Sequence, residues 1–328
     1  MKAIALFSGG LDSQLAAKLI AEQEIDVHAL HFTSAFIPRH GSESESSVAR
    51  EAADNLGFPL TVEDITSELT ELVKNPPHGR GSGYNPCIDC RILQLRRARK
   101  LMKENNAKFV VTGEVLGQRP MSQRRGAIST IEREADLEGL VVRPLCAKSL
   151  EPSLPEEKGW VDRSRLKNFT GRQRTPQIQL AEELGVKDYP DPAGGCRLTE
   201  PGYSRRIRDL LEHDDLNEKN LDLLEVGRHF RLAPGTKLVV GRNHEENLRI
   251  EELALDSDCL FEARDYPGPT SLLRGGADEQ LLEISASITA RYGKGRNEPG
   301  IVVNLLGNET GELIVEPMDD ERLTKWRI

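Results

Sequence analysis

The chain has 328 residues, of which 38% are hydrophobic and 30% charged, and its net charge is −9. This length predicts two domains, and the composition is that of a globular protein rather than a disordered or fibrous one. No apolar run reaches the roughly 20 residues that a membrane-spanning helix needs, and the N-terminus shows no signal-peptide pattern. We therefore expect a cytoplasmic protein with no membrane partner, whose five cysteines are reduced.

An acidic net charge does not exclude a nucleic-acid partner, because phosphate binding needs only a local basic surface. Six basic residues and no acidic one lie between Arg91 and Lys103. Further basic groups follow within residues 119–125, 163–174 and 205–208. Each group is either a solvated helix face or a set of phosphate contacts.

The hydrophobic pattern predicts an α/β domain. Short apolar runs indicate buried strands at residues 3–7, 27–32, 60–62, 109–112 and 140–142. Helical spacing occurs at residues 13–22, 45–56 and 88–104. Strands that alternate with helices indicate a parallel sheet covered on both faces. Ligands bind such sheets at the carboxyl ends of strands, so the loops after Phe7, Phe32 and Thr112 should meet at one site.

The pattern changes after residue 200. We expect a catalytic domain at residues 1–200, a helical connector at 201–229 and a smaller α+β domain at 230–328. Short strands at 237–241 and 300–304 belong to the smaller domain. The glycine- and proline-rich segment 76–86 predicts a mobile loop within the first domain.

The segment between the first strand and the first helix predicts a nucleotide site. It consists of Ser8, Gly9, Gly10, Leu11, Asp12 and Ser13. Glycines let the backbone approach phosphate oxygens, and a helix N-terminus adds positive potential. Both serines can donate hydrogen bonds, and Asp12 can hold the Mg²⁺ that accompanies ATP. The alternative is a tight turn capped by Asp12 or Ser13. No lysine lies where γ-phosphate transfer needs one, which favours AMP transfer over kinase chemistry.

Three cysteines are candidates for chemistry. Cys87 and Cys90 lie three residues apart at a predicted helix start, and Cys196 follows Gly194 and Gly195. The helix dipole should lower the pKa of both paired thiols. The three thiols could hold a [4Fe–4S] cluster with one open iron, or act as a persulfide carrier and a resolving thiol. A zinc site, with His78 as a conceivable ligand, and a plain structural pair are the alternatives.

Several motifs resemble one enzyme superfamily. The loop at residues 8–13 resembles the signature of the PP-loop ATP pyrophosphatases, which binds the pyrophosphate that leaves when ATP adenylates a substrate. Residues 110–123 and 142–145 are similar to consecutive blocks of the PP-loop domain in tRNA 4-thiouridine synthetases. Residues 85–90 also resemble the related 2-thiouridylases. Together these motifs cover roughly residues 1–200.

The resemblance implies an ATP-dependent tRNA sulfurtransferase. In such enzymes ATP adenylates a base carbonyl, and sulfur from a cluster-bound sulfide or a cysteine persulfide replaces the activated oxygen. The implied partners are tRNA and either sulfide or a cysteine desulfurase, and a homodimer is a possible assembly. The resemblance assigns nucleotide or base contacts to the loop at residues 8–13 and to Phe32, Thr33, Gly113 and Gln118. Cys196 matches the second functional cysteine.

Two departures affect the target and the sulfur donor. The synthetases carry an RNA-binding module ahead of the loop, which begins here at residue 8, and a rhodanese-like domain is expected to be missing. Residues 239–247 and 265–269 resemble instead the RNA-binding NFACT-R module, with 290–296 fitting its later helix. This resemblance, over roughly residues 230–315, implies a module that holds tRNA.

Two other functions compete with tRNA thiolation. A PP-loop ligase or amidotransferase acting on a small molecule would need ammonia, but no N-terminal cysteine or glutaminase segment is evident. It would also leave the three cysteines unexplained. An RNA-binding adaptor with a degenerate nucleotide site is disfavoured by the intact loop at residues 8–13.

Overall fold

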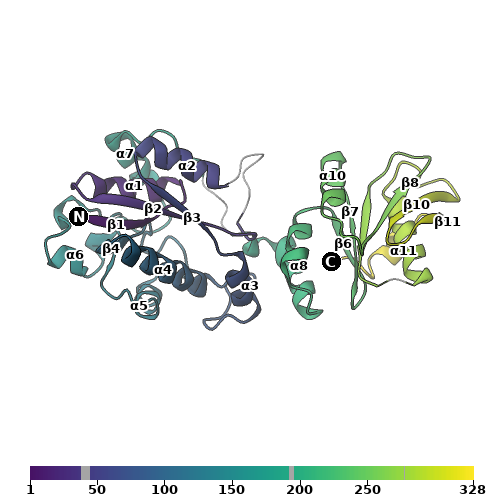
Figure 1. Ribbon diagram of the computed structural model, residues 1–328, viewed down its shortest axis with the longest axis horizontal. Coiled ribbons are helices and arrows are strands. Elements are labelled where there is room, and N and C mark those ends of the chain that lie inside the picture. The colour runs from purple at the N-terminus through teal and green to yellow at the C-terminus, as the bar shows by residue number, and fades with distance from the viewer. Residues whose placement is uncertain (38–44, 192–195, 277) are drawn as a thin grey trace. The chain divides into compact units, whose positions relative to one another are not determined.

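The computed structural model describes residues 1–37, 45–191, 196–276 and 278–328. Its contacts divide the chain into two compact units, Met1–Thr199 and Glu200–Ile328 (Figure 1). The helical segment expected as a connector lies within the second unit. In the described part of the chain, no helix is long and apolar enough to cross a membrane.

The first unit is built on a parallel sheet, which confirms the predicted α/β class. Across the sheet its strands are β3 (Leu60–Asp64), β2 (Asp26–Thr33), β1 (Lys2–Leu6), β4 (Phe109–Val111) and β5 (Val141–Val142). All neighbouring pairs are parallel, and Ala5 of the central strand pairs with Ala29 on one side and Val111 on the other. The chain order reverses between β1 and β4, which is where sheets of this type bind ligands.

Helices cover both faces of this sheet. They are α1 (Leu11–Ala21), α2 (Glu45–Leu56), α3 (Thr66–Lys74), α4 (Cys87–Glu104), α5 (Arg125–Glu134), α6 (Leu154–Glu157) and α7 (Thr175–Leu184). Figure 1 shows α1, α2 and α7 on one face, with α4 and α5 on the other. Helix α5 has no long apolar stripe, since it buries only Ile128 and Ile131, and so it lacked a sequence signal.

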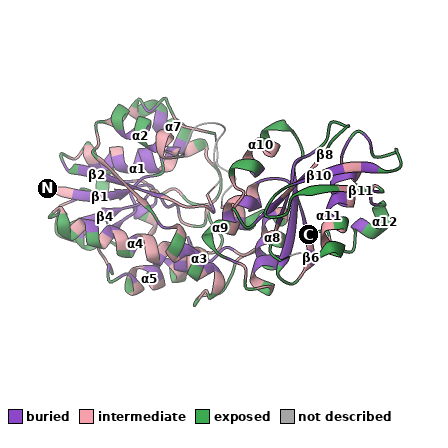
Figure 2. Ribbon diagram, turned by 45° about the vertical axis from the view of Figure 1, so that its right-hand side comes forward, coloured by how far each residue is buried: buried purple, intermediate pink, exposed green. Residues whose placement is uncertain are grey.

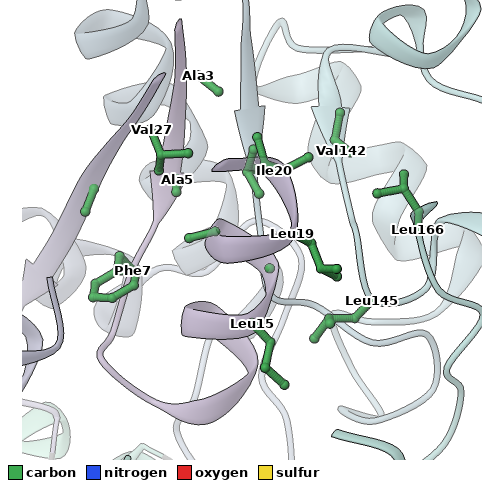
Figure 3. Packing of buried hydrophobic residues seen from close by; sticks show 14 of the residues in the cluster. Ala3, Ala5, Phe7, Leu15, Leu19, Ile20, Val27, Val142, Leu145 and Leu166 are labelled. Carbon is green, nitrogen blue, oxygen red and sulfur yellow. The ribbon is translucent and has the colours of Figure 1, made fainter. Parts of the chain in front are cut away.

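The core of the first unit explains why α1 lies where it does. Leu15, Leu19 and Ile20 of α1 join a buried cluster with Ala3 and Ala5 of β1 (Figure 3). Burial of each large aliphatic side chain stabilises the fold by about 1.5–3 kcal/mol. The small β1 side chains let the helix approach the sheet closely, which holds the loop between β1 and α1 rigidly at the sheet edge.

The second unit contains an antiparallel sheet, as expected for an α+β domain. Its strands, in spatial order, are β11 (Gly311–Val315), β10 (Ile301–Gly307), β8 (Cys259–Ala263), β9 (Ser271–Arg274), β7 (Thr236–Val240) and β6 (Arg228–Ala233). Its helices are α8 (Pro201–Glu212), α9 (Glu218–Leu221), α10 (His244–Glu252), α11 (Glu279–Arg291) and α12 (Asp320–Leu323). Short 3₁₀ turns in the chain are Ala147–Ser149, Arg163–Arg165, Arg197–Thr199 and Asp222–Glu225.

One expected helix of this unit is placed differently. Residues 290–296 were expected to fit a helix, but α11 ends at Arg291 and the following residues form turns. Gly293 and Gly295 favour this ending, because glycine weakens a helix and permits tight turns. Figure 2 shows buried residues along the central strands and exposed ones on β11, at the edge of the sheet.

Candidate active site

The loops that follow β1, β2 and β4 meet at one cavity, as the strand pattern predicts. The cavity has a volume of about 270 Å³. Phe7 and Ser8 line it after β1, Phe32 lines it from the end of β2, and Thr112 and Gly113 line it after β4. These residues come from distant parts of the chain and converge because parallel strands end at the same edge of a sheet.

A second cavity of about 530 Å³ adjoins the first around the predicted nucleotide loop. Ser8, Gly10, Leu11, Asp12 and Ser13 all line it. The two cavities share Ser8, Asp12 and Ser13 in their walls. The loop residues therefore separate two adjoining spaces, and a ligand with two parts could occupy both.

The nucleotide loop ends at an open helix start. The N-cap of α1 is Gly10, so neither Asp12 nor Ser13 caps the helix. This observation argues against the alternative interpretation, in which residues 8–13 are only a tight turn capped by Asp12 or Ser13. Ser13 Oγ donates to the Gly10 carbonyl oxygen at 2.8 Å and accepts from the Ser8 amide at 3.3 Å. The amides of the first turn of α1, which have no capping side chain, suit a phosphate group.

Two glycines, Gly9 and Gly113, permit close approach between backbone segments. Gly9 has φ +74°, and a Cβ there would lie 2.9 Å from backbone atoms of Val48 and Ala49 on α2. Gly9 therefore lets the loop pack on α2, and its contact with a phosphate stays a prediction. A Cβ at Gly113 would lie 2.6 Å from the Asp12 carbonyl carbon, so Gly113 lets the β4 loop touch the nucleotide loop.

Asp12 is the charged centre of the site. Its Oδ2 accepts a hydrogen bond from Gln118 Nε2 at 2.9 Å, while its buried Oδ1 has no partner among the described residues. Burial raises the pKa of Asp12, and the Gln118 hydrogen bond and the charges of Arg174 and Arg119 offset part of that rise. An unpaired, desolvated carboxylate oxygen is a suitable ligand for Mg²⁺.

His31 presents an acceptor to the smaller cavity. Its Nδ1 lies 2.9 Å from the Phe7 carbonyl oxygen, which can only accept, so Nδ1 carries the proton. Burial lowers the pKa of His31, so the ring is neutral and Nε2 keeps its lone pair. Within the described residues, Nε2 has no hydrogen-bond partner. Thr33 lines neither cavity, and its hydroxyl donates a hydrogen bond to Asp64.

Glu114, in the motif at residues 110–123, forms an ion pair with Arg143, in the motif at residues 142–145. Its Oε2 accepts from Arg143 Nε at 2.9 Å, and its Oε1 lies 3.2 Å from Arg91 Nε. Burial alone would raise the pKa of Glu114, but Arg91 and Arg143 together hold it below its usual value. Sequence reasoning assigned these residues no role, although the blocks that contain Glu114 and Arg143 had been recognised.

The paired thiols occupy the first turn of α4. Asn85 Nδ2 donates to Cys87 Sγ at 3.0 Å, and Gln94 Nε2 lies 3.7 Å from Cys90 Sγ. The expectation that the helix dipole lowers both pKa values is wrong for Cys90, because burial raises the pKa of its thiol to about 11. Removal of solvent therefore outweighs the dipole at this position.

Cys196 lies close to the segment that leads into α4. Its Sγ donates to the Phe36 carbonyl oxygen at 3.4 Å, and the Tyr84 amide donates to the Leu198 carbonyl oxygen at 3.0 Å. Gly194 and Gly195, which the sequence marks as a close-approach loop, lie outside the described residues. Cys146 and Cys259 are buried, as expected of core residues.

The three candidate thiols are the chain's possible ligands for an iron–sulfur cluster. Cys87, Cys90 and Cys196 supply the sulfur donors that a cluster uses. In the described ranges, however, no three His, Cys, Asp or Glu side chains are grouped so that they could hold a metal ion. The iron–sulfur cluster at these three thiols therefore stays a prediction.

His78 is not available as a zinc ligand. Its Nδ1 lies 2.7 Å from Asp89 Oδ1 and its Nε2 3.0 Å from Glu134 Oε1, so both ring nitrogens are engaged. The hydrogen bond to Asp89 is the main cause of the raised pKa of His78. Arg80 also donates to the Val73 carbonyl oxygen at 3.0 Å. These bonds connect segment 76–86, which is a loop as expected, to neighbouring elements of the first unit.

The first unit is an α/β domain whose loop at residues 8–13 resembles the PP-loop signature, and the second unit contains an antiparallel sheet. Residues 1–152 match the family model described as thiamine biosynthesis protein (ThiI). Residues 227–327 match the model described as NFACT protein RNA binding domain. The resemblance drawn from the motifs is thus confirmed for both parts of the chain.

Curated relatives agree with these models. The tRNA sulfurtransferase of Desulfurococcus amylolyticus is 29% identical over 221 residues, which are 66% of this chain and 40% of that protein. The tRNA-specific 2-thiouridylase MnmA of Azorhizobium caulinodans is 25% identical over 246 residues, which are 70% of this chain and 59% of that protein. The chain thus spans only about half the length of these relatives.

A solved structure is also similar. It is described as the crystal structure of a 4-thiouridine synthetase–RNA complex with bound ATP. It is 25% identical, with a TM-score of 0.41, and the match covers 68% of this chain and 52% of that chain.

Proposed function

We propose that this chain is an ATP-dependent tRNA sulfurtransferase that adenylates a base carbonyl and replaces its oxygen with sulfur. One observation carries the proposal: the cavity beside the nucleotide loop is also lined by Arg91 and Gln94 of α4. Gln94 contacts Cys90, so the thiol-bearing helix forms a wall of the nucleotide site. The ThiI family match and the tRNA-thiolating relatives support the same function.

The adenylation step follows from the loop geometry. The base oxygen attacks the α-phosphorus of ATP, the bond to the β-phosphate breaks, and pyrophosphate leaves with the electron pair. The open N-terminus of α1 faces the phosphates, and Asp12 would hold the Mg²⁺ that neutralises their charge. His31 Nε2 can accept a hydrogen bond from the adenine amino group or a ribose hydroxyl.

The sulfur step uses the thiols near α4. A sulfur nucleophile attacks the activated base carbon, a C–S bond forms, and AMP leaves with the former base oxygen. If the nucleophile is the outer sulfur of a persulfide on Cys87, a second thiol such as Cys196 then attacks the inner Cys87 sulfur. The S–S bond breaks, the thiolated base leaves, and a dithiol reductant restores both thiols from the Cys87–Cys196 disulfide. If it is a sulfide ion bound elsewhere, no cysteine disulfide forms.

The direct test is a reaction with purified chain, ATP, Mg²⁺, a tRNA transcript and sulfide. We expect AMP, pyrophosphate and one thionucleoside per tRNA, measured by mass spectrometry of digested RNA. AMP formed on small molecules without thiolated RNA would indicate a PP-loop ligase instead. RNA binding without AMP formation would indicate an adaptor with a degenerate nucleotide site.

The sulfur carrier needs its own measurement. Iron and acid-labile sulfide are determined on anaerobically purified protein and on Cys87→Ser. About four irons per chain, lost in the variant, would support a cluster that forms after the thiols rearrange. An iron-free protein that thiolates tRNA only with a cysteine desulfurase would support a persulfide on Cys87.

A further inference from the structure

Three arginines gather around the larger cavity from two segments of the first unit. Arg119, Arg172 and Arg174 all line the cavity beside Gly10, Leu11 and Ser13. The segments meet because the Gly171 amide donates to the Leu116 carbonyl oxygen at 2.8 Å. This bond belongs to an isolated parallel bridge between Leu116 and Thr170.

These arginines differ from the basic run on α4. On α4, Arg97 pairs with Glu68, Arg99 pairs with Asp136 at 3.0 Å, and Arg96 donates to the Glu134 carbonyl oxygen. By contrast, the described residues offer the side chains of Arg119, Arg172 and Arg174 no ion pair or hydrogen bond. The α4 arginines are thus largely paired with groups of the protein itself, whereas the cavity arginines are available to pair with a bound anion.

The charges of the residues that line the larger cavity favour an anionic ligand. Two carboxylates, Asp12 and Asp191, line it with the three guanidiniums, which leaves an excess of positive charge. Behind this wall, the fully buried Gln177 lies close enough to Asp12 to lower the pKa of that carboxylate.

We propose that Arg119, Arg172 and Arg174 bind the β- and γ-phosphates of ATP, and the pyrophosphate they become, opposite the nucleotide loop. This inference rests on the proposed adenylation chemistry. When the α–β phosphate bond breaks, negative charge develops on the leaving pyrophosphate, and the three guanidiniums neutralise it. Arginine suits this role because its planar fork forms two parallel hydrogen bonds to a phosphate.

A polyphosphate fits this position better than an RNA backbone. The arginines share their cavity with the first turn of α1, where Gly10 and Leu11 offer backbone amides. The tail of a nucleotide can reach into such a concave space, whereas the phosphates of a folded RNA lie on a convex surface. Arg91 and the strand ends line the adjoining cavity, which leaves that space for the nucleoside.

The test is pyrophosphate binding by calorimetry to wild type and to Arg172→Ala/Arg174→Ala, with AMP as a second ligand. Each lost charge-assisted contact weakens binding by roughly ten- to a hundredfold, so the double variant should lose at least about a hundredfold for pyrophosphate. AMP affinity should change by less than about threefold. The matched control is Arg99→Ala on α4, which should bind pyrophosphate within about twofold of wild type.

Other outcomes have defined meanings. Unchanged pyrophosphate affinity in the double variant overturns the proposal. Loss of tRNA affinity with unchanged pyrophosphate affinity also overturns it and assigns the arginines to RNA. Arg172→Lys/Arg174→Lys keeps the charge but removes the planar guanidinium groups, so we expect partial recovery of pyrophosphate binding. Retained AMP affinity in the alanine variant shows that this variant is folded. A wild type that binds pyrophosphate but never thiolates tRNA contradicts only the proposed function.

Discussion

The first unit has a nucleotide side, around residues 8–13, and a thiol side, around Cys87, Cys90 and Cys196. The two sides differ in how well the sequence predicts their geometry. On the nucleotide side, six consecutive residues, 8–13, lead from a buried strand into the first turn of a buried helix. On the thiol side, Cys196 lies more than a hundred residues after Cys87 and Cys90. The described residues contain no three His, Cys, Asp or Glu side chains placed to bind one metal ion. A contiguous motif on a rigid turn therefore predicts its own geometry, whereas a motif assembled from distant segments does not.

The largest effect should come from the thiol side. Cys196→Ser removes a sulfur nucleophile or resolving thiol, so thiolation should fall on the order of 10³-fold or more. AMP formation should persist, because Cys196 lines neither described cavity. Thionucleoside per tRNA and AMP are measured in the same reaction, with Cys259→Ser in the second unit as the control. Normal thiolation in Cys196→Ser would remove Cys196 from the mechanism.

The next effect concerns the nucleotide side. Asp12→Asn removes the charge that would hold Mg²⁺ while keeping the size of the side chain, so AMP formation should fall on the order of 10²–10³-fold. Thiolation should fall with it, since the base is no longer activated. Asp26→Asn, at an exposed position on the same sheet, should retain full turnover. Unchanged AMP formation in Asp12→Asn would contradict the nucleotide-site assignment.

Gly113→Ala tests the contact between two loops of the nucleotide side. The added methyl group would lie 2.6 Å from the Asp12 backbone, so we expect a loss of about 1–3 kcal/mol in the free energy of unfolding and a higher KM for ATP. The matched control is Gly126→Ala in α5, where no atom lies within 4 Å of the new Cβ. That control should be neutral or stabilising by up to about 1 kcal/mol. Denaturant titration of both variants provides the comparison.

In the absence of ligand, the ionised carboxylate of Asp12 should lower the free energy of unfolding. Its folded pKa is raised by burial, so the folded state binds a proton more tightly than the unfolded state, and ionisation above the unfolded pKa opposes folding. Asp12→Asn should therefore melt at a higher temperature than wild type at neutral pH, with a smaller difference near pH 4. A lower melting temperature at neutral pH would show that Asp12 is not desolvated.

The smallest effect lies beside the thiols. The pKa of His78 is raised chiefly by its hydrogen bond to Asp89 and also by Glu134. Its stabilising contribution is complete below the unfolded pKa and is lost as pH rises through the raised folded pKa. Glu134→Gln should move the His78 pKa downward in an NMR titration, whereas Glu138→Gln, at an exposed position nearby, should leave it unchanged. An unshifted pKa in Glu134→Gln would mean that the ion pair is absent in solution.

Much of the first unit was predictable because its strands are short, apolar and bounded by turns. Residues 3–7 and 109–112, for example, agree with β1 and β4 to within a residue or two. The helices α3, α5 and α7 were not predicted, since their packing on neighbouring elements, rather than a long apolar stripe, stabilises them. In sequence, the α4 arginines were consistent with a solvated helix face or with phosphate contacts, because their partners, Glu68 on α3 and Asp136 just after α5, lie far away in the chain.

By itself, the sequence determined the α/β class, the position of the nucleotide loop and the thiol-bearing helix start, because each depends on residues that are neighbours in the chain. Only the tertiary structure decided that Gly9 serves packing on α2, that burial raises the pKa of Cys90, and that Arg119, Arg172 and Arg174 share one cavity. The physical reason is that desolvation and charge pairing depend on what surrounds a side chain in space. Distant segments supply those surroundings, and only the folded chain brings them together.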